Sequence, residues 1–274
     1  MLFTYKTKDE FVYLYLMGEF VVSALKYRPQ NFADVVGQQA ITQTLQNAID
    51  LEKIAKAMLF CGPRGVGKTT CARIFAKKIN SGTTELDPNE DFAFNVFELD
   101  AASNNSVADI RNLIEQVRIP PQKGIYKVYI IDEVHMLSSA AFNAFLKTLE
   151  EPPQHAIFIL ATTEKQKIIP TILSRCQIFD FKRISIKDAE DYLKTIASRE
   201  GVRAEADALH LIAQKADGAM RDALSIFDRM VSYSGTALTA KHVSVNLNIL
   251  DYDSYLKITS LLLNGDLHQS ILNF

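Results

Sequence analysis

The chain has 274 residues, of which 48% are hydrophobic and 23% are charged. This composition is that of a globular protein, and it excludes a disordered, collagenous or low-complexity chain. Thirty basic residues against 32 acidic ones give a formal charge of -2, so the net charge of the protein does not by itself attract nucleic acid or anionic lipid. Any phosphate binding must therefore be local, and the length predicts about two folding units.

The cysteines and the apolar runs indicate the compartment. Cys61, Cys71 and Cys176 are too few and too scattered for a disulfide framework or a Cys-x-x-Cys zinc site, which favours a reducing environment. No apolar run approaches the roughly 20 residues that a membrane span requires, and the N-terminal residues lack the pattern of a signal peptide. We therefore expect a cytoplasmic protein with no membrane partner.

The middle of the chain alternates short apolar runs with helical periodicity, the pattern of βαβ units around a mostly parallel, buried sheet. Apolar residues at helical spacing from Val107 to Val117 and from Phe142 to Leu149 predict helices that each cover one face of this sheet. Five strands are predicted, at residues 57–61, 95–99, 127–132, 156–163 and 177–182.

After Arg183 the pattern predicts helices and no further strands. A capping signal at Ser185 opens a helix through Ile196. Further helices are predicted at 206–216, 220–231 and 252–263. The change from alternating strands and helices to helices alone divides the chain into an α/β domain at 25–182, a small helical domain at 183–244 and the start of a truncated helical domain at 245–274. Residues 1–24 match neither pattern and form an extension to which we assign no function, and Met17 is an alternative start.

A glycine-rich segment directly follows the first predicted strand. It satisfies G-x-x-x-x-G-K-[ST] and consists of Gly62, Pro63, Arg64, Gly65, Val66, Gly67, Lys68 and Thr69, with Thr70 next. The glycines let successive backbone N–H groups point at one ligand, and the following helix presents its positive N-terminus to the same point. Lys68 is placed to lie along the β- and γ-phosphates of a nucleotide, and the Thr69 hydroxyl to bind Mg²⁺. The alternative is a glycine-rich turn of no function. A match to this pattern arises by chance somewhere in the chain with a probability of about one in a hundred, before the flanking strand and helix are also required.

Two carboxylates emerge where the third predicted strand ends. Asp132 and Glu133 follow a run of four apolar residues, and ligands of parallel sheets bind at the carboxyl ends of strands. Asp132 can hold Mg²⁺ directly or through water, and Glu133 can orient and deprotonate the attacking water. The alternative is a solvated acidic strand end, which is less favoured beside a phosphate loop that requires a carboxylate for its metal ion.

Several further stretches are shared with a known family. The segments 27–38 (YRPQNFADVVGQ), 132–137 (DEVHML) and 174–176 (SRC) occur with the phosphate loop in the same order as in the AAA+ clamp-loader ATPases, which this sequence resembles. The segments 143–153 (NAFLKTLEEPP), 160–163 (LATT) and 218–224 (GAMRDAL) narrow the resemblance to the gamma/tau type of bacterial DNA polymerase III subunit. The resemblance covers the chain from about Ala24 to the end.

The resemblance implies an AAA+ P-loop NTPase fold. Its parts would be an α/β domain with a parallel five-stranded sheet, a small helical lid at 183–244 and a truncated helical collar at 245–274. Members of the family commonly carry a four-cysteine zinc module between the phosphate-loop helix and the second strand. Residues 80–95 contain no cysteine here, so we predict no zinc site and a polar surface loop at 81–91.

The resemblance also implies roles for single side chains. Thr163 matches the sensor-1 residue, Arg175 the arginine finger that reaches the ATP site of a neighbouring subunit, and Arg221 the sensor-2 arginine. Taken alone, Thr163 could be only a strand former and Arg175 only a salt-bridged surface residue. The positive charge of Arg221 near a helix N-terminus interacts unfavourably with the helix dipole, which suggests an anionic partner for this side chain. The residues that would line the adenine and ribose are Arg28, Pro29 and Val36.

The resemblance implies the ATP-hydrolysing motor subunit of a bacterial replicative clamp loader, with ATP and Mg²⁺ as cofactors. Its partners would be delta, delta-prime and further gamma/tau copies, the sliding clamp and primed DNA, and no polymerase chemistry is expected in this chain. Two alternatives are a nonhydrolysing stator subunit of the same complex and another AAA+ DNA motor such as a helicase. For DNA itself, residues 104–106 are a candidate phosphate cradle, and an ordinary helix cap by Ser106 and Asp109 is the alternative.

Overall fold

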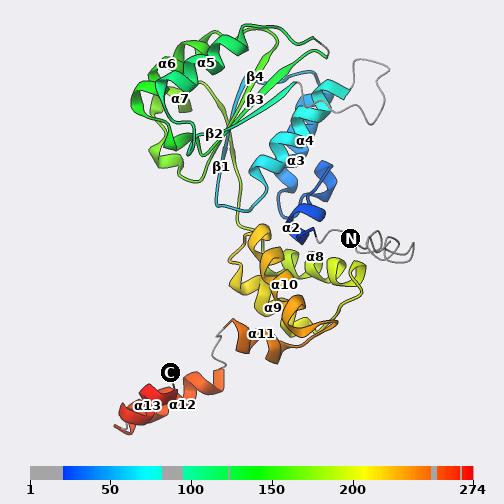
Figure 1. Cartoon of the computed structure of the whole chain (residues 1–274), viewed down its shortest axis with the longest axis vertical. Helices are drawn as coiled ribbons and strands as arrows, with labels where there is room; N and C mark the ends of the chain where they lie inside the picture. Colours follow the sequence, from blue (N-terminus) through cyan, green and yellow to red (C-terminus); the bar gives the residue numbers. More distant parts are fainter. Residues whose placement is uncertain (1–20, 82–94, 123, 248–251, 266, 274) are drawn as a thin grey trace, which may run out of the picture.

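The computed structural model of this chain describes residues 21–81, 95–122, 124–247, 252–265 and 267–273 (Figure 1). Most of the predicted N-terminal extension and most of the predicted polar loop at 81–91 lie outside the described residues. The prediction of no zinc site at 80–95 falls largely on the same stretch.

The centre of the molecule is a sheet of five parallel strands, as the sequence predicts. The predicted bounds differ by one or two residues, since β2 (Val96–Asp100) ends at Asp100 and β5 (Gln177–Asp180) at Asp180. The strands β1 (Ala57–Cys61), β3 (Lys127–Asp132) and β4 (Ala156–Thr162) are buried almost throughout, which explains their nearly unbroken apolar runs. In spatial order the strands are β2 (Val96–Asp100), β3 (Lys127–Asp132), β4 (Ala156–Thr162), β1 (Ala57–Cys61) and β5 (Gln177–Asp180).

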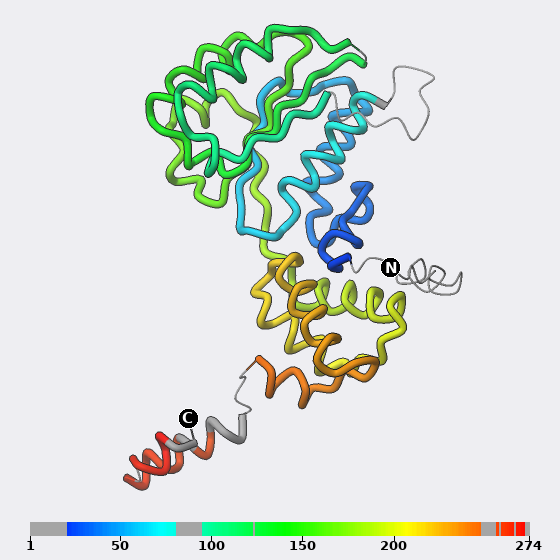
Figure 2. Tube along the Cα trace, in the orientation of Figure 1, coloured from blue at the N-terminus to red at the C-terminus, as the bar shows by residue number. Residues whose placement is uncertain are grey.

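Helices cover both faces of this sheet (Figure 2). Neighbouring residues of β1 point to opposite cores: Phe60 shares one with Phe75 of α4 (Lys68–Ser81), and Leu59 shares the other with Phe145 of α6 (Ser139–Glu150). The first core lies under α3 (Gln39–Asp50) and α4 (Lys68–Ser81), and the second under α5 (Val107–Val117), α6 (Ser139–Glu150) and α7 (Pro170–Leu173).

Side-chain caps begin two helices where the sequence predicts them. At α5, the Ser106 hydroxyl accepts the N–H of Asp109 at 3.2 Å. At α8 (Ile186–Arg199), the Ser185 hydroxyl accepts the N–H of Asp188 at 3.1 Å. Each cap satisfies an N–H that the helix itself leaves without a partner. The helix-cap alternative for Ser106 is therefore confirmed.

A small helical domain follows the sheet in the chain. Its core contains Leu193, Ile212 and Phe227, which are almost completely buried. Among the described residues, no helix is long and apolar enough to cross a membrane. The helices around this core are α8, α9 (Ala206–Lys215), α10 (Met220–Ser234) and α11 (Ala240–Asn246), and beyond them α12 (Tyr252–Leu263) has the predicted bounds and contacts α13 (Leu267–Asn273).

The prediction that strands end at Arg183 is wrong for one short pair. The strands β6 (Arg203–Ala204) and β7 (Ala237–Leu238) form a two-residue parallel ladder, and the N–H of Arg203 donates to the Thr236 carbonyl at 2.9 Å. The connections after α8 and after α10 run side by side here, a long-range pairing that two residues of sequence cannot signal. The seven-residue α11 is likewise shorter than the window in which periodicity predicts a helix.

The first described helix, α2 (Ser23–Lys26), packs against the helical domain rather than the sheet. The N–H of Ser23 donates to the Asp228 carboxylate of α10 at 2.7 Å. The Tyr192 hydroxyl of α8 donates to the Tyr27 carbonyl at 2.9 Å. The domain boundary predicted after residue 24 thus falls inside a segment that these two hydrogen bonds attach to the helical domain.

Two hydrogen bonds hold the chain at the junction between the α/β domain and the helical domain, one on each side of it. The buried Gln38 side chain donates to the Lys182 carbonyl at 2.7 Å, and the N–H of Ile184 donates to the Gly218 carbonyl at 3.1 Å. Gly218 has a φ of +78°, and a Cβ there would lie 2.7 Å from the Cβ of Arg183. Both the backbone conformation and the close approach therefore require glycine at this junction.

We expect Gly218→Ala to destabilise the protein more than Gly201→Ala. Both glycines have a left-handed backbone, with φ of +78° and +67°, so both substitutions cause similar strain, about 1–2 kcal/mol. A Cβ at Gly201 meets no atom within 4 Å, whereas a Cβ at Gly218 meets Arg183 and Ile184. Urea unfolding of the two variants and the wild type measures the difference, and equal losses of stability would contradict the close packing at the junction.

Candidate functional site

A cavity of about 950 Å³ lies between the carboxyl edge of the sheet and the helical domain. Gly62, Pro63 and Thr163 are not part of its wall but form hydrogen bonds to Lys68 or Glu133, which are. The predicted binding residues that line the cavity are Arg28, Pro29, Val36, Arg64, Gly65, Val66, Gly67, Lys68, Thr69, Thr70, Asp132, Glu133 and Arg221.

The glycine-rich segment turns tightly between β1 and α4. Gly62 has a φ of +145°, and a Cβ there would lie 2.4 Å from the carbonyl oxygen of Phe181, so no side chain fits. Lys68 is only 6% exposed, and its ammonium group donates to the carbonyls of Gly62 at 2.7 Å and Pro63 at 2.8 Å. Burial lowers the pKa of Lys68, and nearby carboxylates oppose that shift. The loop thus holds a buried cation next to the ends of the strands.

The two predicted metal ligands lie in contact. The Thr69 hydroxyl donates to Asp132 Oδ2 at 2.7 Å, and Asp132 Oδ1 accepts the N–H of Glu133 at 2.9 Å. A hydroxyl and a carboxylate offer the oxygen ligands that Mg²⁺ prefers. Within the described ranges, no group of three or more His, Cys, Asp or Glu side chains could hold a metal ion. The pair therefore suits an ion that takes its other ligands from water and phosphate.

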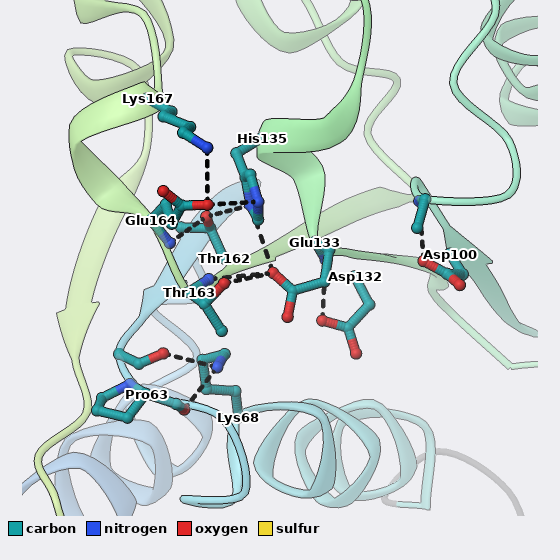
Figure 3. A network of polar contacts seen from close by, with 12 residues as sticks. Pro63, Lys68, Asp100, Asp132, Glu133, His135, Thr162, Thr163, Glu164 and Lys167 are labelled. Carbon is teal, nitrogen blue, oxygen red and sulfur yellow. Dashed lines mark hydrogen bonds and ion pairs between the residues drawn. The ribbon is translucent and has the colours of Figure 1, made fainter.

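Glu133 is held through one of its carboxylate oxygens (Figure 3). Oε2 accepts the Thr163 hydroxyl at 2.9 Å and the Thr163 N–H at 3.2 Å. The residue has a φ of +48°, a left-handed conformation, at the turn between β3 and η3 (Val134–Met136). Non-glycine residues in this conformation cluster at functional sites, where the surrounding structure offsets the strain.

Positive side chains from separate elements share the cavity wall. Burial, followed by the charges of Arg73 and Arg221, lowers the pKa of Arg28, while Glu98 opposes the shift. The Arg73 guanidinium also forms an ion pair with Glu98. Because several cations in one wall repel each other, an anion placed among them would be strongly stabilised.

The helical domain touches the glycine-rich segment directly. The N–H of Arg221, in the first turn of α10, donates to the Gly65 carbonyl at 3.4 Å. A Cβ at Gly65 would lie 3.0 Å from the Cβ of Ala219 and 3.3 Å from that of Arg221. The phosphate loop and the first turn of α10 therefore lie in direct contact, with no room for a side chain between them.

Arg175 does not line the cavity of its own chain. Its guanidinium pairs with Glu150, at the end of α6, at 2.6 Å and donates to the Thr171 carbonyl at 2.7 Å. These contacts match the alternative in which Arg175 is a salt-bridged surface residue. A role for Arg175 at the site of a neighbouring subunit stays a prediction.

Two family models match successive parts of this chain. A family model described as DNA polymerase III, delta subunit matches residues 37–185, and one described as DNA polymerase III clamp loader subunit, ATPase lid domain matches residues 188–236. The tau subunit of DNA polymerase III from Bacillus subtilis is 53% identical over 223 residues, which cover 77% of this chain and 40% of that subunit. The gamma subunit from Buchnera aphidicola subsp. Baizongia pistaciae is 42% identical over 266 residues, which cover 92% and 71%.

The chain belongs to the gamma/tau subunit family of DNA polymerase III. The resemblance seen in the sequence is thereby confirmed. The Escherichia coli tau subunit is 41% identical over 92% of this chain, and the chain spans 41% of its length. This chain therefore spans about two fifths of the tau relatives that it matches.

Solved structures confirm the predicted AAA+ fold of this gamma/tau family member. Thermotoga maritima RuvB, described as a Holliday junction branch migration motor, superposes with a TM-score of 0.64 at 20% identity. The match covers 86% of this chain and 79% of RuvB. At this identity the likeness concerns the fold alone.

Sequence reasoning missed part of the cavity wall in this family member. Glu98 and Asp100 line it from β2. The rule that ligands lie at the carboxyl ends of parallel strands would have found Asp100, the last residue of that strand. On α10, Ser225 and Asp228 also line it, four and seven residues after Arg221. That spacing places all three on one face of a helix, so the helical period counted from Arg221 could have identified Ser225 and Asp228 in the sequence.

The three cysteines are shielded by the fold. Cys61 and Cys71 are buried, and Cys176 is half-buried. Burial raises the pKa of the Cys71 thiol to about 12 and the pKa of the Cys61 and Cys176 thiols to about 11. All three groups therefore remain protonated thiols at neutral pH.

We expect the native cysteines to react slowly with iodoacetamide, because the thiolate is the reactive form. Below the pKa, the thiolate fraction rises about tenfold for each pH unit, so the native rates should still be rising beyond pH 9. In urea, where burial is lost, the rates should be higher and level off at lower pH. Mass spectrometry of the modified peptides measures each site. A native cysteine that reacts at pH 8 as fast as in urea would contradict the raised pKa.

Proposed function

We propose that this chain is the ATP-hydrolysing motor subunit of a bacterial clamp loader, which loads the sliding clamp onto primed DNA. The observation that carries the proposal is that Lys68, Asp132 and Arg221 line one cavity in a member of the gamma/tau family. These side chains come from the glycine-rich loop, the sheet and the lid. Their charges and spacing suit a nucleoside triphosphate with its metal ion.

ATP suits the cavity in size and charge. The volume of about 950 Å³ lies in the range of small-molecule sites. The backbone N–H groups at the start of α4 and the Lys68 ammonium suit the phosphates. Thr69 and Asp132 would hold Mg²⁺, which when bound neutralises phosphate charge. The adenine and ribose would lie against Arg28, Pro29 and Val36.

The hydrolytic step requires a base for the attacking water and cations for the charge that develops on the phosphates. Glu133 is the proposed base, because its carboxylate lines the cavity and Thr163 holds only one of its oxygens. Lys68 and Arg221 would stabilise the developing negative charge from within the chain. Arg175 would add a further cation to the site of a neighbouring subunit.

The lid would transmit the state of the nucleotide to the assembly. The contact between Gly65 and Arg221 links the phosphate loop to the first turn of α10, so phosphate binding at the loop would change the lid angle. In a complex with delta, delta-prime and further gamma/tau copies, ATP binding would draw the subunits into an arc that opens the clamp and holds primed DNA. Hydrolysis would then release both. We place this work in the cytoplasm.

Two alternatives are disfavoured by particular residues. A nonhydrolysing stator has no need of a buried lysine in the loop or of the contact between Thr69 and Asp132. Another DNA motor, such as a helicase, shares the AAA+ fold, but the relatives of high identity are tau and gamma subunits of DNA polymerase III, and residues 188–236 match a clamp-loader lid model.

We expect ATP turnover by the full-length subunit, assembled with delta and delta-prime, to rise most when clamp and primed DNA are added together. The reason is that the proposed work couples hydrolysis to release of both. Phosphate release is measured with the clamp, a primed template, and duplex DNA of the same length, each alone and combined. Equal stimulation by duplex DNA without clamp would favour a helicase, and absence of turnover would favour a stator.

We expect Lys68→Ala and Arg175→Ala each to abolish most turnover of the assembly, and a mixture of the two chains to recover part of it. In the mixture, the Arg175→Ala chain keeps an intact nucleotide site and receives Arg175 from the Lys68→Ala chain. Because an arginine finger contributes about 10³ to 10⁵ in turnover, even a minority of complete interfaces is measurable.

The control for this mixture is a chain with both substitutions. Mixed with either single variant, it completes no interface and should recover nothing. Failure of the two single variants to complement each other in correctly assembled complexes would contradict the action of Arg175 on a neighbour.

A further inference from the structure

We propose that His135 is a positioning residue that holds the Glu133 carboxylate in place for the hydrolytic step. The inference rests on the proposed ATPase function and adds a residue to it. His135 lies in η3, two residues beyond the proposed base, and does not line the cavity itself. It would act through Glu133 and not on the nucleotide.

The His135 side chain is almost buried, with 6% of its surface exposed. Its Nδ1 lies 3.0 Å from Thr162 Oγ1 and 3.3 Å from Glu133 Oε2. Its Nε2 lies 3.2 Å from Glu164 Oε1. Figure 3 shows the ring between Glu133, which follows β3, and Glu164, which follows β4. Both ring nitrogens thus face a carboxylate oxygen.

The chemistry of the groups around the ring decides which of them could accept a ring proton. An ionised carboxylate can only accept, so in each of these ion-pair contacts a ring N–H would be the donor and the glutamate the acceptor. Lys167 donates to the same Glu164 carboxylate at 2.8 Å, and this hydrogen bond lowers the pKa of Glu164. Thr162 Oγ1 already accepts the N–H of Glu164 at 3.0 Å. A proton on Nδ1 therefore has the Glu133 carboxylate as its charged acceptor.

The contacts of Glu133 are all on one side of its carboxylate. Oε2 lies within reach of three donors, the Thr163 N–H, the Thr163 hydroxyl and His135 Nδ1. No hydrogen bond or ion pair among the described residues engages Oε1. A carboxylate that is held through Oε2 presents Oε1 in a fixed direction, which is what a base needs to take a proton from a water in line with the phosphate.

The far side of the ring is anchored as well. Glu164 directly precedes η4 (Lys165–Lys167), and the pairing of Lys167 with Glu164 closes that turn. The imidazole is therefore fixed at both nitrogens and cannot rotate away from Glu133 without losing its contact with Glu164. Fixed supporting groups of this kind give a reacting side chain its precision.

Two substitutions test the roles of the two ring nitrogens separately. The amide of His135→Asn places a donor near the position of Nδ1, toward Glu133, and the amide of His135→Gln places one near Nε2, toward Glu164. In the full-length assembly, we expect kcat for ATP hydrolysis to fall about tenfold in His135→Gln, which corresponds to about 1.4 kcal/mol. We expect His135→Asn to retain most of the wild-type kcat, and the dissociation constant for ATP to be unchanged in both.

A matched control is His155→Gln, which alters a half-buried histidine whose Nε2 bonds the Val117 carbonyl at 2.8 Å, away from the cavity. It should leave kcat unchanged, and thermal unfolding of all variants shows whether kcat follows stability. Equal kcat in His135→Asn and His135→Gln, or a loss that follows stability or ATP affinity, would overturn the role of His135. A wild-type assembly that binds no ATP would instead overturn the proposed function.

Discussion

The parallel register of the central sheet is the constraint on which the site depends. Because all five strands run the same way, their carboxyl ends meet at one edge. The register sets Asp100 of β2 beside Asp132 of β3, and Cys61 of β1 beside Thr162 of β4. The loop that leaves β1 therefore starts in line with the carboxylates of β3 and the threonines of β4. A shift of one strand by one residue would turn these side chains to the other face of the sheet.

This edge brings opposite charges together in a partly buried space. Lys68 is buried, yet it has two carbonyl acceptors in its own loop, which offsets the cost of removing its charge from water. Asp132 and Glu133 lie beside it, and the network extends through His135 to Glu164 and Lys167 (Figure 3). Polar networks of this kind are stable only when each member has a partner, so they hold their side chains in defined positions.

The lid contacts the α/β domain at the phosphate loop, where Gly65 meets the first turn of α10. At the junction itself, Gln38 bonds the Lys182 carbonyl on one side and Ile184 bonds the Gly218 carbonyl on the other. In addition, α2 lies on the lid through its contacts with α10. The cavity wall therefore contains residues from both domains, and its shape depends on the angle between them.

By itself, the sequence determined the elements whose parts are contiguous. The strand, the glycine-rich turn and the helix that starts at Lys68 follow one another directly, and so do β3 and its acid pair, because hydrophobic periodicity and glycine conformation act over a few residues. Relationships over long distances required the folded chain: the contact of Arg221 with Gly65, the pairing of Arg175 with Glu150, the β6–β7 ladder and the enclosure of His135 between two glutamates. Register and packing decide these contacts, and no local pattern encodes them, because each joins residues that come together only after the core has formed.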